Sequence, residues 1–283
     1  MKGFTVKVSN YEFKVITSTN KEDGSTLIKT GSQRRGKPCI VCTVTTDDKL
    51  VVDFIEYDPN CSDTSDLKRG EGGTVVMLYT TLKFIVQQHP HIKVVELYDE
   101  SKFNCGGYQV NLVMLRLILK NETWYQSIVP GIKANKYTIK RIASNNKQLN
   151  STIDSDLLDK FKTFAKYNPD VGRYFRKINV KLTRIVEDAI ESGKTLRQLL
   201  ISINEQIGCL FFHYFIHTLL LVDISNNKWS VTLENLTPIL EKLDIDWTKI
   251  ENPIDFKKTF YGGRGKVLKS YGNVLLGDSE DLF

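Results

Sequence analysis

Two short runs rich in β-branched residues, at 50–57 and 92–98, enclose a polar, glycine-rich stretch and one amphipathic helix. The helix begins at residue 74 and carries apolar residues at helical intervals until Pro90 ends it. A strand, a glycine-containing loop, a helix and a second strand form a βαβ unit, whose strands are parallel and whose crossover is right-handed. The chain must therefore fold around a sheet with at least one parallel pair.

The residues before this unit predict an antiparallel meander. Residues 4–8 and 11–17 alternate apolar and polar side chains, and residues 38–45 form a strand and turn with the run at 50. The intervening stretch 21–37 is polar and contains three glycines, so we expect an exposed loop.

Helical periodicity dominates the second half of the chain. After one helix expected at 111–126, the apolar spacing predicts four more, at 154–167, 171–191, 195–222 and 233–243. The sequence thus predicts an α+β fold, with a mixed sheet and flanking helices followed by a mostly α-helical C-terminal domain.

Charge is distributed unevenly between the two halves. The 283 residues carry a net charge of +6, and residues 1–150 hold 21 of the 39 basic and 15 of the 33 acidic side chains, which accounts for the whole excess. This half should prefer an anionic ligand such as a phosphate-bearing cofactor, and nucleic acid is not the partner that we expect.

Cysteine usage indicates a reducing compartment. The five cysteines are odd in number and scattered, and the chain begins MKGFTVKVSN without an apolar leader. The longest apolar run, 207–222, is shorter than the roughly 18 to 20 residues of a bilayer span, so it predicts a buried helix. We expect a cytoplasmic protein without a membrane span.

The high Lys, Asn and Ile content favours an AT-rich genome such as that of a virus or a protist, and a viral protein could also reside in the virion.

The glycine-rich residues 67–74, LKRGEGGT, open the long helix. Glycines let backbone amides approach a ligand closely, and amides at a helix N-terminus carry partial positive charge, so this arrangement suits a diphosphate. Lys68 and Arg69 add full charges beside it. The alternative is a solvent loop that only caps the helix. The segment is neither a P-loop nor a dinucleotide-binding GxGxxG.

In this order of elements, the segment resembles the Gcn5-related N-acetyltransferase (GNAT) superfamily over residues 1–130. Arg69 and Gly72 match the family's Arg/Gln-x-x-Gly-x-Gly/Ala signature, and Thr74 departs from it at the position of the last glycine or alanine. The resemblance implies that the pantetheine of acetyl-CoA, the co-substrate, lies between splayed strands at 50–57 and 92–98. It implies a diphosphate-binding segment formed by Lys68, Arg69, Gly70, Gly72, Gly73 and Thr74.

The same resemblance implies that an amine attacks the thioester directly, which requires a base for the ammonium and a proton donor for the thiolate. Glu56 is the first candidate base and Asp53 the second; their positions on a regular strand face opposite sides of the sheet, so only one can face the cleft. Tyr125 is the candidate donor. The alternatives are a solvated strand face for the two carboxylates and helix-end packing for the tyrosine.

These features divide the chain into a GNAT-like acyl-CoA-binding domain (1–132), a basic linker (133–150) and a helical domain (151–283). We expect an acyl-CoA-dependent N-acetyltransferase acting on an amine-bearing small molecule or protein, with a homo-oligomer or assembly contact through 151–283. The alternative is a catalytically inactive GNAT-like structural or interaction protein, such as a component of a viral particle.

Metal chemistry is not expected. Cys39 and Cys42 are three residues apart on a predicted strand and face opposite sides, so we interpret them as strand-core residues rather than zinc ligands. His213 and His217 share a helical face but lack the glutamate of HExxH and lie among aromatics, which indicates core histidines.

Overall fold

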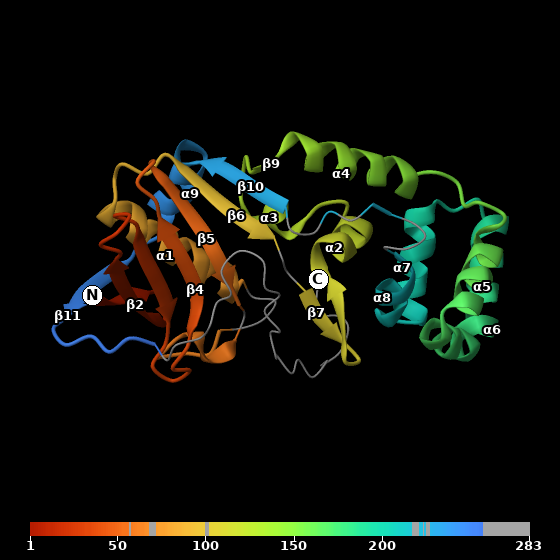
Figure 1. Ribbon diagram of the computed structural model, residues 1–283, viewed down its shortest axis with the longest axis horizontal. Coiled ribbons are helices and arrows are strands. Elements are labelled where there is room, and N and C mark those ends of the chain that lie inside the picture. The colour runs from red at the N-terminus through yellow and green to blue at the C-terminus, as the bar shows by residue number, and fades with distance from the viewer. Residues whose placement is uncertain are drawn as a thin grey trace.

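A computed structural model describes residues 1–56, 58–67, 72–99, 102–216, 221–222, 224 and 227–256. It confirms the α+β class: a nine-stranded sheet is combined with several helices, and α5–α8 form a helical stretch at one end of the elongated molecule (Figure 1). Helix α4 runs between this stretch and the sheet.

The sheet has the strand order β11-β1-β2-β3-β4-β5-β6-β10-β9. Its described neighbours pair antiparallel except β5 and β6, which are parallel as the βαβ pattern predicts. A separate hairpin pairs β7 with β8. The bounds are β1 (Lys2–Val8), β2 (Tyr11–Thr19), β3 (Thr26–Gly31), β4 (Pro38–Val44), β5 (Lys49–Ile55), β6 (Val94–Asp99), β7 (Lys102–Cys105), β8 (Tyr108–Asn111), β9 (Lys133–Ala134), β10 (Asn227–Thr232) and β11 (Asp246–Ile250).

Two hydrophobic clusters form the interior. In the first, α1 and α9 cover one face of the sheet; in the second, α2 packs with α5–α8. Ile142 on α4 contacts both clusters. The helix bounds are η1 (Pro59–Cys61), α1 (Gly73–Gln88), α2 (Leu112–Lys120), α3 (Trp124–Ile128), α4 (Lys136–Leu149), α5 (Leu157–Tyr167), α6 (Pro169–Glu191), α7 (Leu196–Gln206), α8 (Leu210–Phe215) and α9 (Leu233–Lys242).

Several expected elements have different limits. The stretch 21–37 is not all loop, because it contains β3, which pairs with β2 and β4. The helix expected at 111–126 is divided into α2 and α3 at Asn121, whose φ of 61° ends α2, and Thr123 then caps α3. The helix expected at 195–222 is interrupted at Gly208, which has a φ of 99°. Each break places a left-handed residue where apolar periodicity alone continues.

The proposed division of the chain also changes. Residues 133–150, expected to be a linker, form β9 and α4, and residues after the helical stretch return to the sheet as β10 and β11. β10 pairs with β6 over the full length of both strands, and β11 extends the opposite edge beside β1. The sheet is therefore completed by chain from both sides of the helical stretch.

Two disulfides link the described cysteines. Cys39 is bonded to Cys61 across 22 residues, and Cys105 to Cys209 across 104 residues, while Cys42 is buried and free. Cys39 and Cys42 both lie buried on β4, as the strand interpretation predicted. Structural disulfides do not persist in a reducing cytosol, so these bonds do not fit the reducing compartment expected from cysteine number and spacing.

Alkylation of the denatured, unreduced protein should modify a single cysteine, Cys42, because the other four are bonded. After reduction all five should react, and mass spectrometry of peptides would count them. Loop-closure entropy makes the Cys105–Cys209 bond the more stabilising, by about 4 to 5 kcal/mol against about 3 kcal/mol for Cys39–Cys61. Reaction of all five cysteines before reduction would contradict the pairing.

Arg197 joins three helices at the base of the helical stretch. No described carboxylate forms an ion pair with it; its guanidinium instead donates to backbone carbonyls at the end of α2 and to side-chain amides. Partial burial lowers the pKa of this guanidinium. Its acceptors are the carbonyls of Leu117 and Ile118 and the Oδ1 atoms of Asn121, Asn146 and Asn150.

Replacing Arg197 by alanine should lower the free energy of unfolding by about 2 to 4 kcal/mol, because several half-buried acceptors lose a charged donor. Arg197→Lys should recover only part of this loss, since an ammonium cannot reach all five acceptors. Arg184→Ala, at an exposed position on α6, is the control and should change stability by less than about 0.5 kcal/mol. Urea unfolding would measure all three; equal effects at both positions would contradict the role of Arg197.

Candidate functional site

The N-terminus of α1 lies where the glycine-rich segment predicted it. Gly72 is the N-cap with a φ of 77° and, as a glycine, has no side chain that could cap the helix; the first turn of α1 contains no acidic residue. Among the described residues, a Cβ added to Gly72 would meet no atom within 4 Å, so they leave the space beside this amide open. Gly73 is buried and Thr74 is half-buried. Lys68, Arg69 and Gly70 lie outside the described residues.

The parallel strands β5 and β6 separate at the end nearest to this helix start. Their pairing covers four positions and ends at Val52 opposite Leu97, although β5 continues to Ile55 and β6 to Asp99. Because α1 connects the end of β5 to the start of β6, its N-terminus lies at the same end as this separation. Ligands in open α/β sheets commonly bind at such a strand end.

A β-bulge in β5 coincides with the point of separation. On the β4 side, Cys42 pairs with Val52 and Val41 with Phe54, so Asp53 is the extra residue in the ladder. Bulges bend a strand and increase its twist, which accounts for the departure of β5 from β6 immediately afterwards. The bulge also breaks the alternation on which the sequence argument about Asp53 and Glu56 relied, since Val52 before it and Ile55 after it both contact the first core.

Asp53 is exposed and its carboxylate accepts a hydrogen bond from Thr43 Oγ1 at 2.7 Å. Although the residue is exposed, partial desolvation of its carboxyl raises the pKa of Asp53 above its usual 3.8, and the Thr43 hydrogen bond offsets part of that rise. A raised pKa makes a carboxylate a stronger base, so this position has the chemistry that proton acceptance requires.

Glu56 has a different environment from the one expected of a free base. Its Oε2 lies 2.6 Å from Nη2 of Arg35, and the same guanidinium contacts Asp58 Oδ2 at 3.1 Å and Cys39 Sγ at 3.1 Å. Arg35 is only 12% exposed, so this ion pair is sheltered. The Glu56 carboxylate would have to leave the guanidinium before it could accept a proton from a substrate.

Tyr125 belongs to the first hydrophobic core. It is 6% exposed at the start of α3, beside Trp124, and packs in the same cluster as Tyr79 of α1. That core lies on the α1 face of the sheet, toward which Leu50 and Val52 point. Asp53 interacts instead with Thr43, which pairs with Val51 on β5 and therefore belongs to the opposite face. An acid and a base on opposite faces can act on one substrate only through the gap between β5 and β6.

Sequence reasoning missed Arg35 and Thr43 as neighbours of the candidate carboxylates. Arg35 stands in the polar stretch at 21–37, which the sequence predicted as loop, and nothing in its spacing indicates Glu56 as partner. Thr43 could have been found, because a strand-turn-strand unit places it across from residues 51–53.

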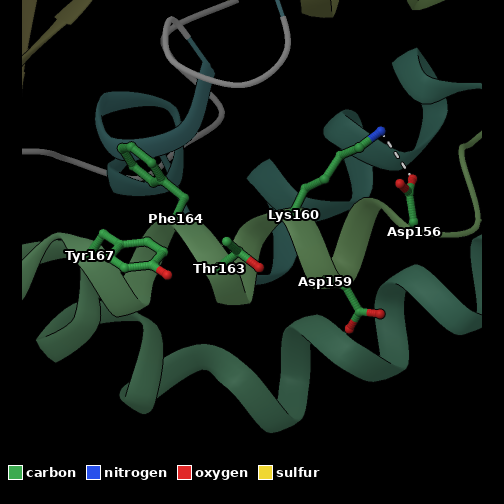
Figure 2. A pocket seen from close by; sticks show the side chains of 6 residues that line it. All are labelled: Asp156, Asp159, Lys160, Thr163, Phe164 and Tyr167. Carbon is green, nitrogen blue, oxygen red and sulfur yellow. Dashed lines mark ion pairs between the residues drawn. The ribbon is translucent and has the colours of Figure 1, made fainter.

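A surface hollow beside α5 lies elsewhere and does not bring reactive groups together. Figure 2 shows its lining side chains along α5 and just before it. Lys160 is paired with Asp156 at 3.0 Å and with Asp154 at 2.6 Å, and the ring of Tyr167 faces solvent. Since the groups come from one helix and its charges are already paired, this hollow lacks converging functional groups. Its lining residues are Asp156, Asp159, Lys160, Thr163, Phe164 and Tyr167.

Within the described ranges, no three His, Cys, Asp or Glu side chains gather as metal ligands would, and every helix is too short or too polar for a bilayer span. His213 is half-buried rather than in the core, with Nδ1 3.1 Å from the carbonyl of Gln109 and its ring beside Tyr108. His217 lies outside the described residues.

Comparisons of the chain with protein-family models, curated proteins and solved structures find no match.

The carboxyl of Asp53 should titrate above 3.8, whereas that of Asp47, held by Lys49 and Thr45, should titrate at about 2. Because folding raises the Asp53 pKa, the contribution of Asp53 to stability should be lost as the pH rises from 3.8 through the folded-state pKa, so the stability of the wild type relative to Asp53→Asn should fall over this range. Asp53→Asn keeps an acceptor for Thr43 and should lose less stability over this range. Carboxyl ¹³C NMR and unfolding at several pH values would measure both effects; an Asp53 pKa below 3.8 would contradict the prediction.

Proposed function

We propose that the protein is an acyl-CoA-dependent N-acetyltransferase that transfers an acetyl group from acetyl-CoA to an amine. The observation that carries this proposal is the end of the β5–β6 pairing at Val52 and Leu97, at the end of the sheet where α1 begins with Gly72 as its N-cap. A gap between parallel strands accepts an extended ligand, and a helix N-terminus without acidic residues accepts an anion. Acetyl-CoA combines both chemical parts in one molecule: an extended pantetheine arm and, next to it, an anionic diphosphate.

Gly72 supports the assignment of the diphosphate end. Its left-handed conformation strongly favours glycine, and the open space beside its Cα lets phosphate oxygens approach the first-turn amides. Gly73 and Thr74 supply the following amides. Lys68, Arg69 and Gly70 remain part of the proposal on the sequence resemblance.

In the proposed reaction the amine nitrogen attacks the thioester carbonyl, the C–N bond forms and the C–S bond breaks. The base removes a proton from the nitrogen, and the departing thiolate receives a proton, so the products are an amide and free CoA. Asp53 is the better base of the two carboxylates, because Glu56 is held by Arg35. Tyr125 is the proposed donor, reaching the sulfur from the α1 side of the gap.

A second candidate is a GNAT-like structural or interaction protein without turnover. The sheltered Arg35–Glu56 ion pair and the burial of Tyr125 favour it, since both have complete structural explanations. The two disulfides also favour a protein that meets oxidising conditions, as a component of a viral particle released from a cell would.

Calorimetry with acetyl-CoA tests the first proposal. We expect micromolar binding to the wild type and at least about tenfold weaker binding to Gly72→Ala, because the new Cβ occupies the space proposed for the diphosphate. Gly193→Ala is the matched control: Gly193 has a φ of 63° and also no atom within 4 Å of an added Cβ, so the backbone cost is similar without any effect on the site.

Acetyl-pantetheine, which lacks the diphosphate, should bind weakly to all three proteins. Acetyl transfer to a panel of amines, with Asp53→Asn and Glu56→Gln beside the wild type, then separates the two candidate bases. No binding of acetyl-CoA to the wild type, or equal weakening by both glycine variants, would remove the proposal and leave the non-catalytic role.

A further inference from the structure

Helix α4 presents a basic surface that none of the proposed chemistry uses. Between Glu122 and Asp154 the chain carries five basic residues and no acidic one. The structure turns this stretch into a helix whose buried positions are Thr138, Asn145 and Leu149, so most of its circumference faces solvent. As Figure 1 shows, α4 runs along the edge of the molecule between the sheet and the helical stretch.

The lysines of α4 lie on one line. With 3.6 residues per turn, Lys136, Lys140 and Lys147 fall within about 40° of one another around the helix axis, over about 16 Å of its length. All three are exposed, as is Lys133 just before the helix. The buried residues Asn145 and Thr138 lie on the opposite side, where Asn145 exchanges two hydrogen bonds with the backbone of Val222.

Among the residues that the structure describes, no carboxylate neutralises these cations. Lys133, Lys136, Lys140 and Lys147 form no ion pair with any described carboxylate, whereas Lys160 and Lys162 on α5 are both paired with aspartates. Unpaired like charges along one line repel one another and favour a ligand with a line of negative charges.

An aromatic side chain flanks the line of lysines. Tyr137 is 61% exposed, and the guanidinium of Arg141 lies 4.2 Å from the centre of its ring. Interleaved cations and an exposed aromatic ring are typical of nucleic-acid-binding surfaces, where lysines contact phosphates and rings stack on bases.

We propose that the surface formed by Lys133 of β9 and by the exposed Lys136, Tyr137, Lys140 and Lys147 of α4 binds the phosphate backbone of a nucleic acid. An anionic membrane fits this face less well, because an interfacial helix needs an apolar face and the apolar Ile142 and Leu149 are packed inward, leaving Ile139 exposed. Sequence composition gave no reason to expect a nucleic acid, since it does not reveal that these cations share one exposed face. The proposal does not depend on the acetyltransferase assignment.

Fluorescence anisotropy with a labelled oligonucleotide tests the proposal, using single-stranded DNA, single-stranded RNA and duplex DNA of equal length. We expect binding to at least one of them, weakening linearly on a log–log plot as salt rises. The variant Lys136→Ala/Lys140→Ala/Lys147→Ala should bind at least about tenfold more weakly at low salt, and the slope of its salt dependence should be shallower by about 2 to 3.

The variant Lys160→Ala/Lys162→Ala/Lys166→Ala on α5 is the matched control, because it removes the same charge from three exposed lysines of one helix. It should keep nearly the wild-type affinity, and circular dichroism would verify that both variants are folded. Equal losses in the two variants, no binding of any oligonucleotide, or equal binding of poly-glutamate or phosphatidylserine vesicles would overturn the proposal.

Discussion

The parallel contact between β5 and β6 is the interaction on which the rest of this structure depends. It joins the antiparallel meander β1–β5 to the half of the sheet formed by β6, β10 and β9, and it needs the crossover helix α1. The contact is short because the bulge at Asp53 turns β5 away after four pairs. The same local irregularity therefore ends the β5–β6 pairing near the centre of a continuous nine-stranded sheet.

Among the described residues, three specific contacts connect the helical stretch to α2, α4 and the β7–β8 hairpin, the elements between it and the sheet. Arg197 binds the end of α2 and two asparagines of α4, Ile142 touches both hydrophobic clusters, and the Cys105–Cys209 bond ties the β7–β8 hairpin to the start of α8. Helix α4 takes part in two of these three contacts with its inner side alone. Its outer side is thus free to carry uncompensated charge without a cost to packing.

Local context separates the two candidate carboxylates, although they are three residues apart. Asp53 stands at the bulge, is exposed and has a raised pKa, whereas Glu56 is paired with a nearly buried arginine and stabilises the loop around the Cys39–Cys61 bond. A carboxylate that neutralises a sheltered guanidinium is structural first, since removing it would leave that charge without a partner.

Sequence by itself determined the elements whose signal is local. Period-two alternation gave the β1–β2 hairpin, β4 and β5, and the apolar spacing after Gly73 gave α1 and, with it, the parallel β5–β6 pair. Strand β3 was not predictable, because its polar surroundings hide a short segment that becomes a strand only by pairing with β2 and β4. The location of Gly72 at a helix start was likewise predictable, since that conformation is a property of a few adjacent residues.

Tertiary structure alone decided the return of β10 and β11 to the sheet, the partner of Arg35, the two disulfides and the alignment of the α4 lysines on an exposed face. The first three join residues that are far apart in the chain, and the last depends on which face of the helix is covered. Neither a long-range contact nor the covered face of a helix is determined by the residues adjacent in sequence.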